Sequence, residues 1–345
     1  MKPIGICESL LTRVRTKRDD NLSWESALQK NGIDYEPIDC YSCDIIRSFD
    51  DYSGIIWHYE NFVNADLMEA QNLLDIAESK GLKVFPNHNT AWHFDDKIAE
   101  SYYLDSLGAP IPNYWVFYEL DKVIEWAKNK ATYPLVAKLR RGSGSNNVKI
   151  IKSSNELIKY AKRMLTRGYS PAQSILYKTY SKAQSTHDIK TLMKRIKKIP
   201  DFLKARSFGK RMPIEKGYCY FQEFIENDGY DLKVVVVGDK CTFLSRNVRK
   251  GSFKASGGGD LNYDHSKIPL SVVESAFRTA DAIKSQCMGF DFVVDNRTKN
   301  GVIIEMCYGF DFEAIYGSGG YWDRDLKWHE EPFNTTYEVV SSVFS

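Results

Sequence analysis

Short apolar runs and stretches with helical spacing alternate through the first 95 residues of the chain. The runs typical of strands are 3–7, 33–38, 54–59 and 83–85, and the stretches typical of amphipathic helices are 21–30 and 64–80. Strands that alternate with helices predict a parallel sheet flanked by helices. Because no G-x-G-x-x-G sequence occurs here, we interpret residues 1–95 as a scaffold for one wall of a site rather than as a dinucleotide-binding domain.

The pattern changes after this region, and antiparallel strands become frequent. Helices are expected at 98–107, 120–130, 154–165 and 271–285, and strands at 114–118, 134–139, 147–151, 218–225, 231–237, 241–248, 290–294 and 301–306. Neighbouring strands in this part are joined by short turns, which favours hairpins and an α+β fold. We therefore predict two further parts, 96–215 with a basic insert near 168–216, and 216–345 ending in a C-terminal strap.

Composition indicates an ordinary globular protein. The 345 residues are 43% hydrophobic and 27% charged, with a formal net charge of +2, so there is no overall bias toward nucleic acid or anionic lipid. No apolar run approaches the roughly 18 residues that span a bilayer. Two or three domains, without a membrane span, are expected from this length.

The seven cysteines are scattered and follow no signal-peptide pattern, which is typical of a reducing compartment and predicts a cytoplasmic protein. Cys40 and Cys43 are the only close pair, and we interpret them as buried or incidental thiols, since no helix-opening redox context or zinc spacing accompanies them. His88 and His93 are five residues apart, which does not place them on one helical face, so both are interpreted as structural.

A lysine and a glycine–serine loop form the most informative segment. Lys138 ends an apolar strand, and the sequence 142–146, Gly-Ser-Gly-Ser-Asn, leads back into the next strand. Glycines allow backbone N–H groups to converge on an anion, and the lysine supplies a positive charge to the same phosphates. Because the lysine precedes the glycines and no helix follows, this is not a Walker A loop. A flexible hairpin tip is an equally good interpretation of this segment alone.

Two carboxylates lie within hydrophobic strands near the C-terminus. Asp291 belongs to Gly-Phe-Asp-Phe-Val-Val, and Glu305 to Val-Ile-Ile-Glu-Met-Cys. A carboxylate in such a strand is unfavourable unless it is paired or binds a metal, and two of them on neighbouring strands suit Mg²⁺. Salt bridges to buried lysines are the alternative.

A third cluster combines cations with a glycine-rich segment. Lys233 and Arg246 fall on successive expected strands, with Asp231 beside the first, and Lys254 lies in the glycine-rich loop 251–259. Converging cations suit a developing phosphoryl charge. Each residue taken singly is equally compatible with a solvated strand face.

Together these three clusters resemble the ATP-grasp superfamily of carboxylate–amine ligases, over about residues 85 to 310. The likeness is to the branch of glutamate ligases that act on ribosomal-protein tails, to uncharacterised bacterial ATP-grasp proteins with Trp-His-Phe-Asp-Asp-Lys and Lys-Leu-Arg-Arg-Gly-x-Gly-Ser-x-Asn-Val strings, and more distantly to D-alanine–D-alanine ligase. It implies an α/β N-terminal parallel-sheet domain followed by an α+β ATP-grasp domain pair, with ATP and Mg²⁺ as cofactors.

The resemblance also implies residue roles. Lys97 and Lys138 would bind the phosphates of ATP, and Asp291 and Glu305 would bind magnesium. Arg246, Lys233 and Lys254 would stabilise the reacting groups. The remaining nucleotide contacts are assigned to the loop Gly142, Ser143, Gly144, Ser145 and Asn146, to the hinge Gln222, Glu223, Phe224 and Ile225, to Glu226 or Asp228 at the ribose, and to Asp231.

Two positions depart from the family pattern. Cys307 stands where the family usually has asparagine, and a neutral thiol is a poor ligand for a hard cation, so Asp311 is considered as a replacement. Lys233 stands where the family has arginine and lacks its bidentate fork. Both changes bear on catalysis more than on phosphate binding.

The function implied is an ADP-forming ligase that joins a small-molecule carboxylate to an amine through an acyl phosphate. The alternative is a nucleotide-binding sensor or assembly module without turnover. A third hypothesis is a polyanion-binding protein, because residues 190–211 carry nine lysines and arginines against Asp201 alone. This insert is interpreted as a solvated face or as an arm for an acidic glycan or peptide, with nucleic acid disfavoured. The aromatic segment 317–330 is expected to pack across the core as a strap, or to line an acceptor pocket.

Overall fold

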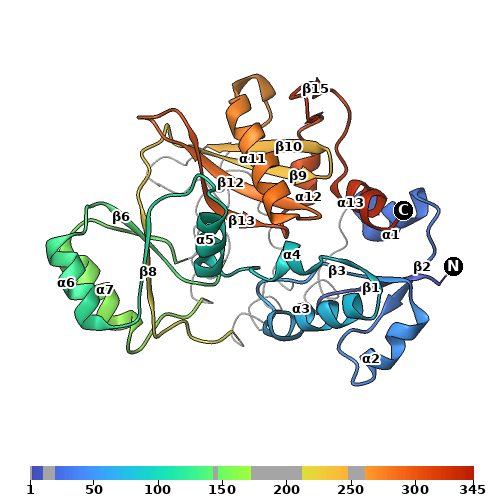
Figure 1. Cartoon of the computed structure of the whole chain (residues 1–345), viewed down its shortest axis with the longest axis horizontal. Coiled ribbons are helices and arrows are strands. Elements are labelled where there is room, and N and C mark those ends of the chain that lie inside the picture. The colour runs from blue at the N-terminus through green and yellow to red at the C-terminus, as the bar shows by residue number, and fades with distance from the viewer. Residues whose placement is uncertain (1, 11–19, 143–146, 172–211, 248–260) are drawn as a thin grey trace, which may run out of the picture.

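The computed structural model describes residues 2–10, 20–142, 147–171, 212–247 and 261–345. These residues form three sheets, and the helices cover the outer faces of the sheets (Figure 1). The expected parallel sheet at the N-terminus and the expected antiparallel sheets in the rest of the chain are both present.

The parallel sheet has the strand order β2-β1-β3-β4, with β2 at Tyr35–Ile38, β1 at Ile4–Cys7, β3 at Gly54–Trp57 and β4 at Lys83–Phe85. β1 and β3 are buried along their whole length, which explains why both read as continuous apolar runs. The connecting elements are η2 Asp20–Leu22, α1 Trp24–Lys30, α2 Ile45–Ser48, η3 Phe49–Asp51, α3 Asn64–Ser79 and α4 His88–Ala91. The start of α1 is fixed by Ser23, whose hydroxyl accepts a hydrogen bond from the Ser26 N–H.

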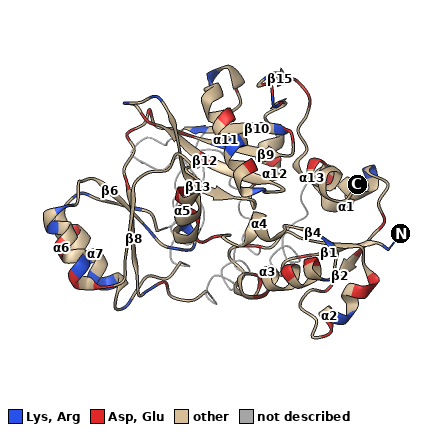
Figure 2. Cartoon of the chain, viewed as in Figure 1, with Lys and Arg blue, Asp and Glu red and all other residues tan. Residues whose placement is uncertain are grey.

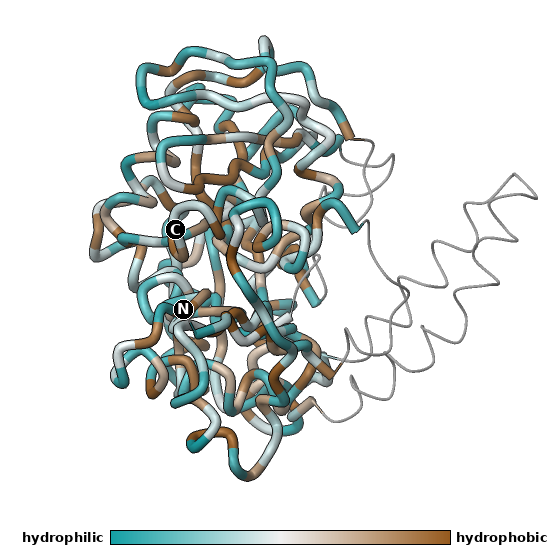
Figure 3. Tube along the Cα trace, turned by 90° about the vertical axis from the view of Figure 1, so that its right-hand side faces the viewer, coloured by the Kyte–Doolittle hydropathy of each residue, from teal (hydrophilic) through white to brown (hydrophobic). Residues whose placement is uncertain are grey.

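The C-terminal helix α13, Thr335–Val343, returns to this first sheet. Val339 and Val340 are fully buried in its core, so the two ends of the chain lie close together (Figures 1 and 3). The N-terminal sheet is therefore completed by the last residues of the chain, which the sequence pattern did not indicate.

The second sheet is antiparallel, with the order β5-β8-β6-β7. Its strands are β5 Tyr114–Phe117, β8 Cys219–Glu223, β6 Leu135–Lys138 and β7 Lys149–Ile151, and it is covered by α6 Leu120–Asn129 and α7 Ser154–Met164. The expected hairpin around the glycine–serine loop is confirmed, since Leu135 pairs with Ile151 and Ala137 with Lys149.

The largest sheet has the order β13-β12-β9-β10-β14-β15, with β11 also paired to β10. The strands are β9 Tyr230–Val237, β10 Lys240–Asn247, β11 Leu261–Asn262, β12 Met288–Val294, β13 Gly301–Cys307, β14 Tyr321–Trp322 and β15 Trp328–His329. The accompanying helices are η4 His265–Lys267, α11 Leu270–Ile283 and α12 Phe312–Tyr316.

Alternate residues of this sheet enter different cores. Leu232 and Val234 belong to the cluster formed with α11, whereas Val235 and Val237 join the core of the parallel sheet. The large sheet is therefore a layer between α11 and the N-terminal part of the chain, and its second face is available to form one wall of a site.

The C-terminal aromatic segment packs at the edge of the large sheet. Trp322 pairs with Cys241 of β10, and its ring lies 5.2 Å from that of Phe243, while Trp328 stacks at 4.4 Å on His265. None of the helices among the described residues is long and apolar enough to cross a membrane.

Candidate active site

A row of charged side chains crosses three neighbouring strands of the large sheet. Lys233 of β9 is opposite Asp291 of β12, which in turn is opposite Glu305 of β13. Residues directly opposite each other in antiparallel strands extend from the same face. Their apolar neighbours Leu232, Phe290 and Phe292 face α11, so the charged row faces away from that helix. The sheet thereby presents one cation and two carboxylates on a single surface.

Arg246 holds two buried carboxylates at the edge of this row. Its guanidinium donates to both oxygens of Asp231, at 2.6 and 3.0 Å, and lies 3.1 Å from Oδ1 of Asp291. Lys233 Nζ lies 2.5 Å from the same Oδ1. Burial alone would raise the pKa of Asp291, but Arg246 and Lys233 outweigh it and lower the pKa to about 2. For Asp231 burial dominates and raises the pKa to about 6, although Arg246 opposes it.

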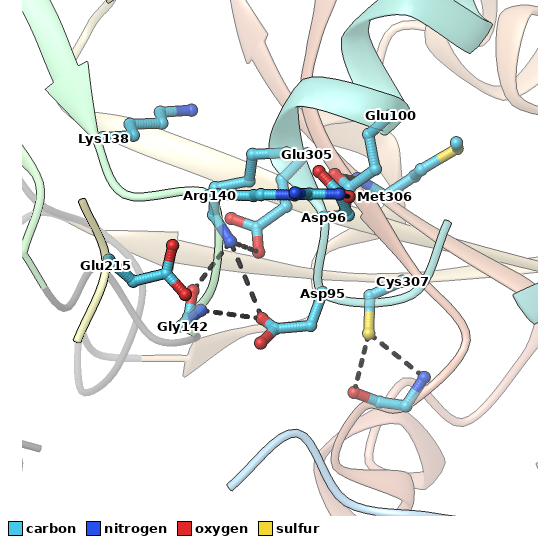
Figure 4. Close-up of polar contacts among 12 residues, drawn as sticks. Asp95, Asp96, Glu100, Lys138, Arg140, Gly142, Glu215, Glu305, Met306 and Cys307 are labelled. Atoms are coloured by element: carbon cyan, nitrogen blue, oxygen red, sulfur yellow. Dashed lines mark hydrogen bonds and ion pairs between the residues drawn. The ribbon is translucent and has the colours of Figure 1, made fainter. Parts of the chain in front are cut away.

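The start of α5, Lys97–Ser106, meets the glycine–serine loop where the loop leaves β6. Asp96 caps the helix by accepting from the Ala99 N–H at 3.1 Å and also accepts from Arg140 Nε at 2.6 Å. Asp95 accepts from the Gly142 N–H at 2.9 Å, and Lys97 Nζ donates to the Gly142 carbonyl at 2.7 Å. Gly142 is therefore held from both sides at the first residue of the loop (Figure 4).

Gly142 has a φ of 117°, which L side chains rarely adopt. Asp95 itself has a φ of 57°, an uncommon left-handed conformation for a residue with a side chain. Gly142 adopts its conformation without strain because it has no Cβ, whereas Asp95 holds a left-handed conformation that is uncommon for a residue with a side chain.

Lys97 also joins the loop to the large sheet. Its Nζ lies 3.4 Å from Oε1 of Glu305 and 3.9 Å from Oδ1 of Asp95. Burial would lower the pKa of Lys97, but Glu305, Asp95 and Glu100 outweigh it, and the pKa is raised. Burial raises the pKa of Asp95 to about 7 and that of Glu100 well above its usual range. Glu100 accepts a hydrogen bond from the Met306 N–H at 3.3 Å.

Lys138 reaches the same region from β6 of the second sheet. The residue is 7% exposed, and Nζ donates to the carbonyl of Ile304 at 3.0 Å, the residue before Glu305. Burial lowers the pKa of Lys138 to about 8, with Glu305 opposing the shift and Lys97 adding to it. This lysine is therefore a cation whose charge is lost at mildly alkaline pH.

The affinity of this cluster for a phosphate-bearing anion, with ATP as the probe, should consequently fall as the pH rises above about 8. The ammonium form binds phosphate, and each pH unit above its pKa reduces that form by up to about tenfold. Affinity is measured between about pH 7.5 and 9.5, a range in which the phosphates of the nucleotide do not change their protonation state. The matched variant Lys138→Met should bind weakly at every pH and show a flat profile. A wild-type affinity that does not change over this range would contradict the expectation.

The expected hinge connects the second sheet to the large one. Gln222 is buried at the end of β8, and Glu223 accepts from Asn113 Nδ2 at 2.7 Å and lies 3.7 Å from Arg297. Beyond them, Glu226 and Asp228 are exposed, and their role at the ribose hydroxyls stays a prediction. The structure places these residues between two sheets, where a hinge is expected.

Many of the predicted site residues are brought together. The contacts above connect eight of them, directly or through the Ile304 backbone: Lys97, Lys138, Gly142, Asp231, Lys233, Arg246, Asp291 and Glu305. Ser143, Gly144, Ser145, Asn146 and Lys254 lie outside the described residues. Asp95 and Glu100 were missed as site residues. The sequence did contain a signal for both. Asp95 lies two residues before Lys97, and Glu100 lies three residues after it, on the same face of the expected helix.

The thiol of Cys307 is occupied by the backbone. Its Sγ donates to the Gly309 carbonyl at 3.1 Å and accepts from the Gly309 N–H at 3.2 Å, and burial raises its pKa. Asp311 uses Oδ1 to cap α12, at 3.1 and 3.2 Å from two backbone N–H groups. In this arrangement Cys307 is neutral, and Asp311 has a structural role.

The donor set fits one magnesium ion. Mg²⁺ binds through one or two carboxylates plus phosphate oxygens and water, and Asp291 and Glu305 are carboxylates on one face of paired strands. Both ion pairs of Asp291 end on Oδ1. Within the described ranges no group of three or more His, Cys, Asp or Glu is arranged around a metal position. A magnesium ion here would therefore need the phosphates of a nucleotide to complete its coordination.

No protein-family model matches this sequence, and no curated protein matches it. Solved structures do. A RimK domain ATP-grasp protein from Sphaerobacter thermophilus is similar with a TM-score of 0.58 and 13% identity, over 99% of this chain and 100% of that one. D-alanine–D-alanine ligase from Bacillus anthracis is similar with a TM-score of 0.54 and 14% identity, over 89% of this chain and 87% of that one. D-cycloserine synthetase is similar with a TM-score of 0.60 and 10% identity, over 98% of this chain and 97% of that one. The chain therefore has the ATP-grasp fold, as the resemblance predicted.

Proposed function

We propose that this protein is an ADP-forming, ATP-dependent ligase that joins a carboxylate to an amine. The observation that carries the proposal is the row Lys233–Asp291–Glu305 on one sheet, to which Lys97 and Lys138 converge from two other elements. Cations and magnesium-type carboxylates on facing elements form a site for a nucleoside triphosphate. We also propose a cytoplasmic location, because none of the seven cysteines forms a disulfide.

In the proposed reaction, Lys97, Lys138 and Arg246 would neutralise the phosphates of ATP. Magnesium, held by Asp291 and Glu305, would supply charge stabilisation at the β- and γ-phosphates. A substrate carboxylate attacks the γ-phosphorus, which forms an acyl phosphate and releases ADP. The substrate amine then attacks the acyl carbon and releases inorganic phosphate. Orientation and exclusion of water are the main contributions of the protein, because acyl phosphates hydrolyse readily.

Two named structural neighbours support this reaction class. D-alanine–D-alanine ligase and D-cycloserine synthetase are ligating enzymes by name. A third, the biotin carboxylase domain of a 2-oxoglutarate carboxylase from Hydrogenobacter thermophilus, was solved with MgADP, with a TM-score of 0.54 and 13% identity over 98% of this chain and 69% of that one. We propose ATP and Mg²⁺ as the cofactors of this chain on that basis and on the residues of the site.

The test is ADP release by the purified protein with MgATP and a panel of carboxylates and amines. ADP and phosphate should appear in equal amounts only with a productive pair, and addition of excess chelator should abolish the release. Release of AMP and pyrophosphate would contradict an acyl-phosphate route. The variant Lys138→Met should fold and lose this activity, which separates the site from a contaminating ATPase.

A second function, nucleotide binding without turnover, is favoured by Cys307. Cys307 stands where the family pattern has a metal-binding asparagine, and its sulfur is hydrogen-bonded to the backbone of Gly309. In that case calorimetry would detect ATP binding but no substrate pair would release ADP, and Cys307→Asn would tighten magnesium binding. Turnover with any pair would exclude it.

A further inference from the structure

A hollow lined by basic residues lies on the second sheet's helical side, away from the charged row. It has a volume of about 530 Å³, and its lining includes Lys159, Lys162, Arg163 and Arg167 of α7 and the turn after it, with Ile214 opposite them. All five side chains are exposed. Lysine and arginine residues mark α7 at the edge of the molecule, far from β13 (Figure 2). We call this feature the basic hollow.

The floor of the basic hollow is well defined. Tyr169 and Glu215 exchange two backbone hydrogen bonds of 3.0 Å, which holds Ile214 beside Gly168. Arg163 donates from Nε to the Gly168 carbonyl at 3.2 Å, and its guanidinium lies 4.2 Å from the centre of the Tyr169 ring. The hollow is thus a built concavity and not a gap between loose side chains.

The cations of the basic hollow are uncompensated. None of Lys159, Lys162, Arg163 or Arg167 forms an ion pair with any residue that the structure describes. The helix dipole favours cations only in the last turn of α7, which does not account for Lys159 or Arg167. Residues 172–211, which adjoin the hollow in the chain, contain eleven lysines and arginines against two aspartates and so add net positive charge to this part of the sequence.

We propose that the basic hollow binds an acidic polypeptide segment that also carries apolar side chains. Lys159 and Arg163 are about 6 Å apart along the helix, close to the roughly 6.6 Å between alternate residues of an extended chain. Ile214 is 56% exposed among the cations and offers an apolar contact.

A single-stranded nucleic acid fits less well. Such ligands stack their bases on exposed aromatic rings, and Tyr169 is the aromatic residue nearest to the hollow. Arg163 lies over its ring at 4.2 Å, and Tyr160 stacks on it at 5.4 Å with an interplanar angle of 21°. Its faces are therefore already covered by the protein. An acidic peptide needs no such ring, so among the described residues the observations favour the peptide.

This site goes beyond the proposed ligase function and is independent of it. Binding is measured by fluorescence anisotropy on the full-length protein without nucleotide, using a short labelled peptide in which glutamate alternates with serine and leucine. The same peptide with glutamine for glutamate, and a single-stranded oligonucleotide of equal charge, serve as comparison probes. Failure of peptide binding leaves the ligase proposal intact, and the absence of ligase activity leaves this proposal intact.

The triple variant Lys159→Glu, Lys162→Glu, Arg167→Glu should weaken binding of the glutamate peptide by about tenfold or more. A control variant with the same change of charge, Lys30→Glu, Lys299→Glu, Lys327→Glu, alters exposed lysines elsewhere and should change affinity by less than about twofold. Ile214→Ser should weaken binding about two- to fivefold. Thermal melts verify folding, and the same three residues changed to Gln provide a milder variant if the first does not fold.

Three outcomes would overturn the proposal. The wild-type protein would bind the glutamine and glutamate peptides equally, or neither. The two triple variants would lose affinity to the same extent, which would indicate long-range attraction by total charge. Alternatively, the oligonucleotide would bind more tightly than the peptide through the same residues, which would assign the hollow to nucleic acid.

Discussion

Replacement of Arg246 with alanine should lower the free energy of unfolding by about 3–5 kcal/mol, because removal of one partner leaves a buried charge without compensation. Arg246 makes both hydrogen bonds to Asp231, whose side chain is 5% exposed, and Lys233 contacts Asp291 instead. Asp231 therefore loses its bidentate partner, while Asp291 keeps one cation. Urea unfolding of the nucleotide-free protein measures the loss.

The pH dependence of this variant tests the cause. Burial already raises the pKa of Asp231 to about 6, and without the guanidinium the pKa should rise further. A folded-state pKa above the unfolded value means that the folded protein holds the proton more tightly, so stability is regained as the pH falls. The deficit of Arg246→Ala should thus shrink between about pH 8 and pH 5. An undiminished deficit at low pH would indicate lost packing instead of an uncompensated charge.

A double variant provides the matched control. Arg246→Met combined with Asp231→Leu removes both charges and replaces them with apolar groups, an exchange that is often neutral or stabilising at buried ion pairs. Most of the stability should return, whereas ATP turnover should not, since the cation that would face the phosphates is absent. Recovery of activity together with stability would show that Arg246 has only a structural role.

The sequence pattern predicted the individual strands and sheets better than the contacts between the two ends of the chain. Continuous apolar runs identified β1 and β3, because a strand that is buried on both faces does not alternate between apolar and polar residues. The same reasoning did not reveal that Val339 and Val340 of α13 complete the core of the first sheet. Amphipathic spacing shows that a helix has a buried face, but it does not identify the distant element that this face contacts.

The candidate site shows a similar division. Lys138, Asp291 and Glu305 stood out in the sequence because a charge within an apolar strand requires a partner. The sequence left a metal ion and buried lysines open as partners, and the structure shows Lys97 at Glu305 and both Lys233 and Arg246 at Asp291. Asp95 and Glu100 were not singled out although both lie close to Lys97 in the sequence, because neither belongs to an apolar strand and only the folded chain shows that both are buried.

The contacts of Lys97 connect the two halves of the site. Its Nζ bonds to Gly142 at the start of the loop and lies 3.4 Å from Glu305 on the large sheet. A phosphate that approached Lys97 would compete with Glu305 for the ammonium. Glu305 would then be released toward a metal ion that enters with the nucleotide, so phosphate and metal binding should be coupled at this pair.

This coupling makes Glu305 the most informative carboxylate to replace. Glu305→Gln should reduce ATP turnover at least about a hundredfold at ordinary magnesium concentrations, because the metal ion that Glu305 would help to hold contributes several kcal/mol to the stabilisation of phosphoryl charge. The magnesium concentration required for half-maximal rate should rise in parallel. Glutamine keeps the size of the side chain, and the partly exposed position, 26% for the Glu305 side chain, limits the effect on stability.

Glu274→Gln, an exposed position on α11, is the matched control and should leave both the rate and the magnesium requirement unchanged. A structural role for Glu305 would lower the melting temperature without moving the magnesium dependence. If turnover falls but the magnesium requirement stays constant, Glu305 acts only by holding Lys97. The shift in metal requirement therefore distinguishes a metal ligand from the ion-pair partner seen in the structure, and Asp291→Asn should show the same shift if the two carboxylates hold one ion.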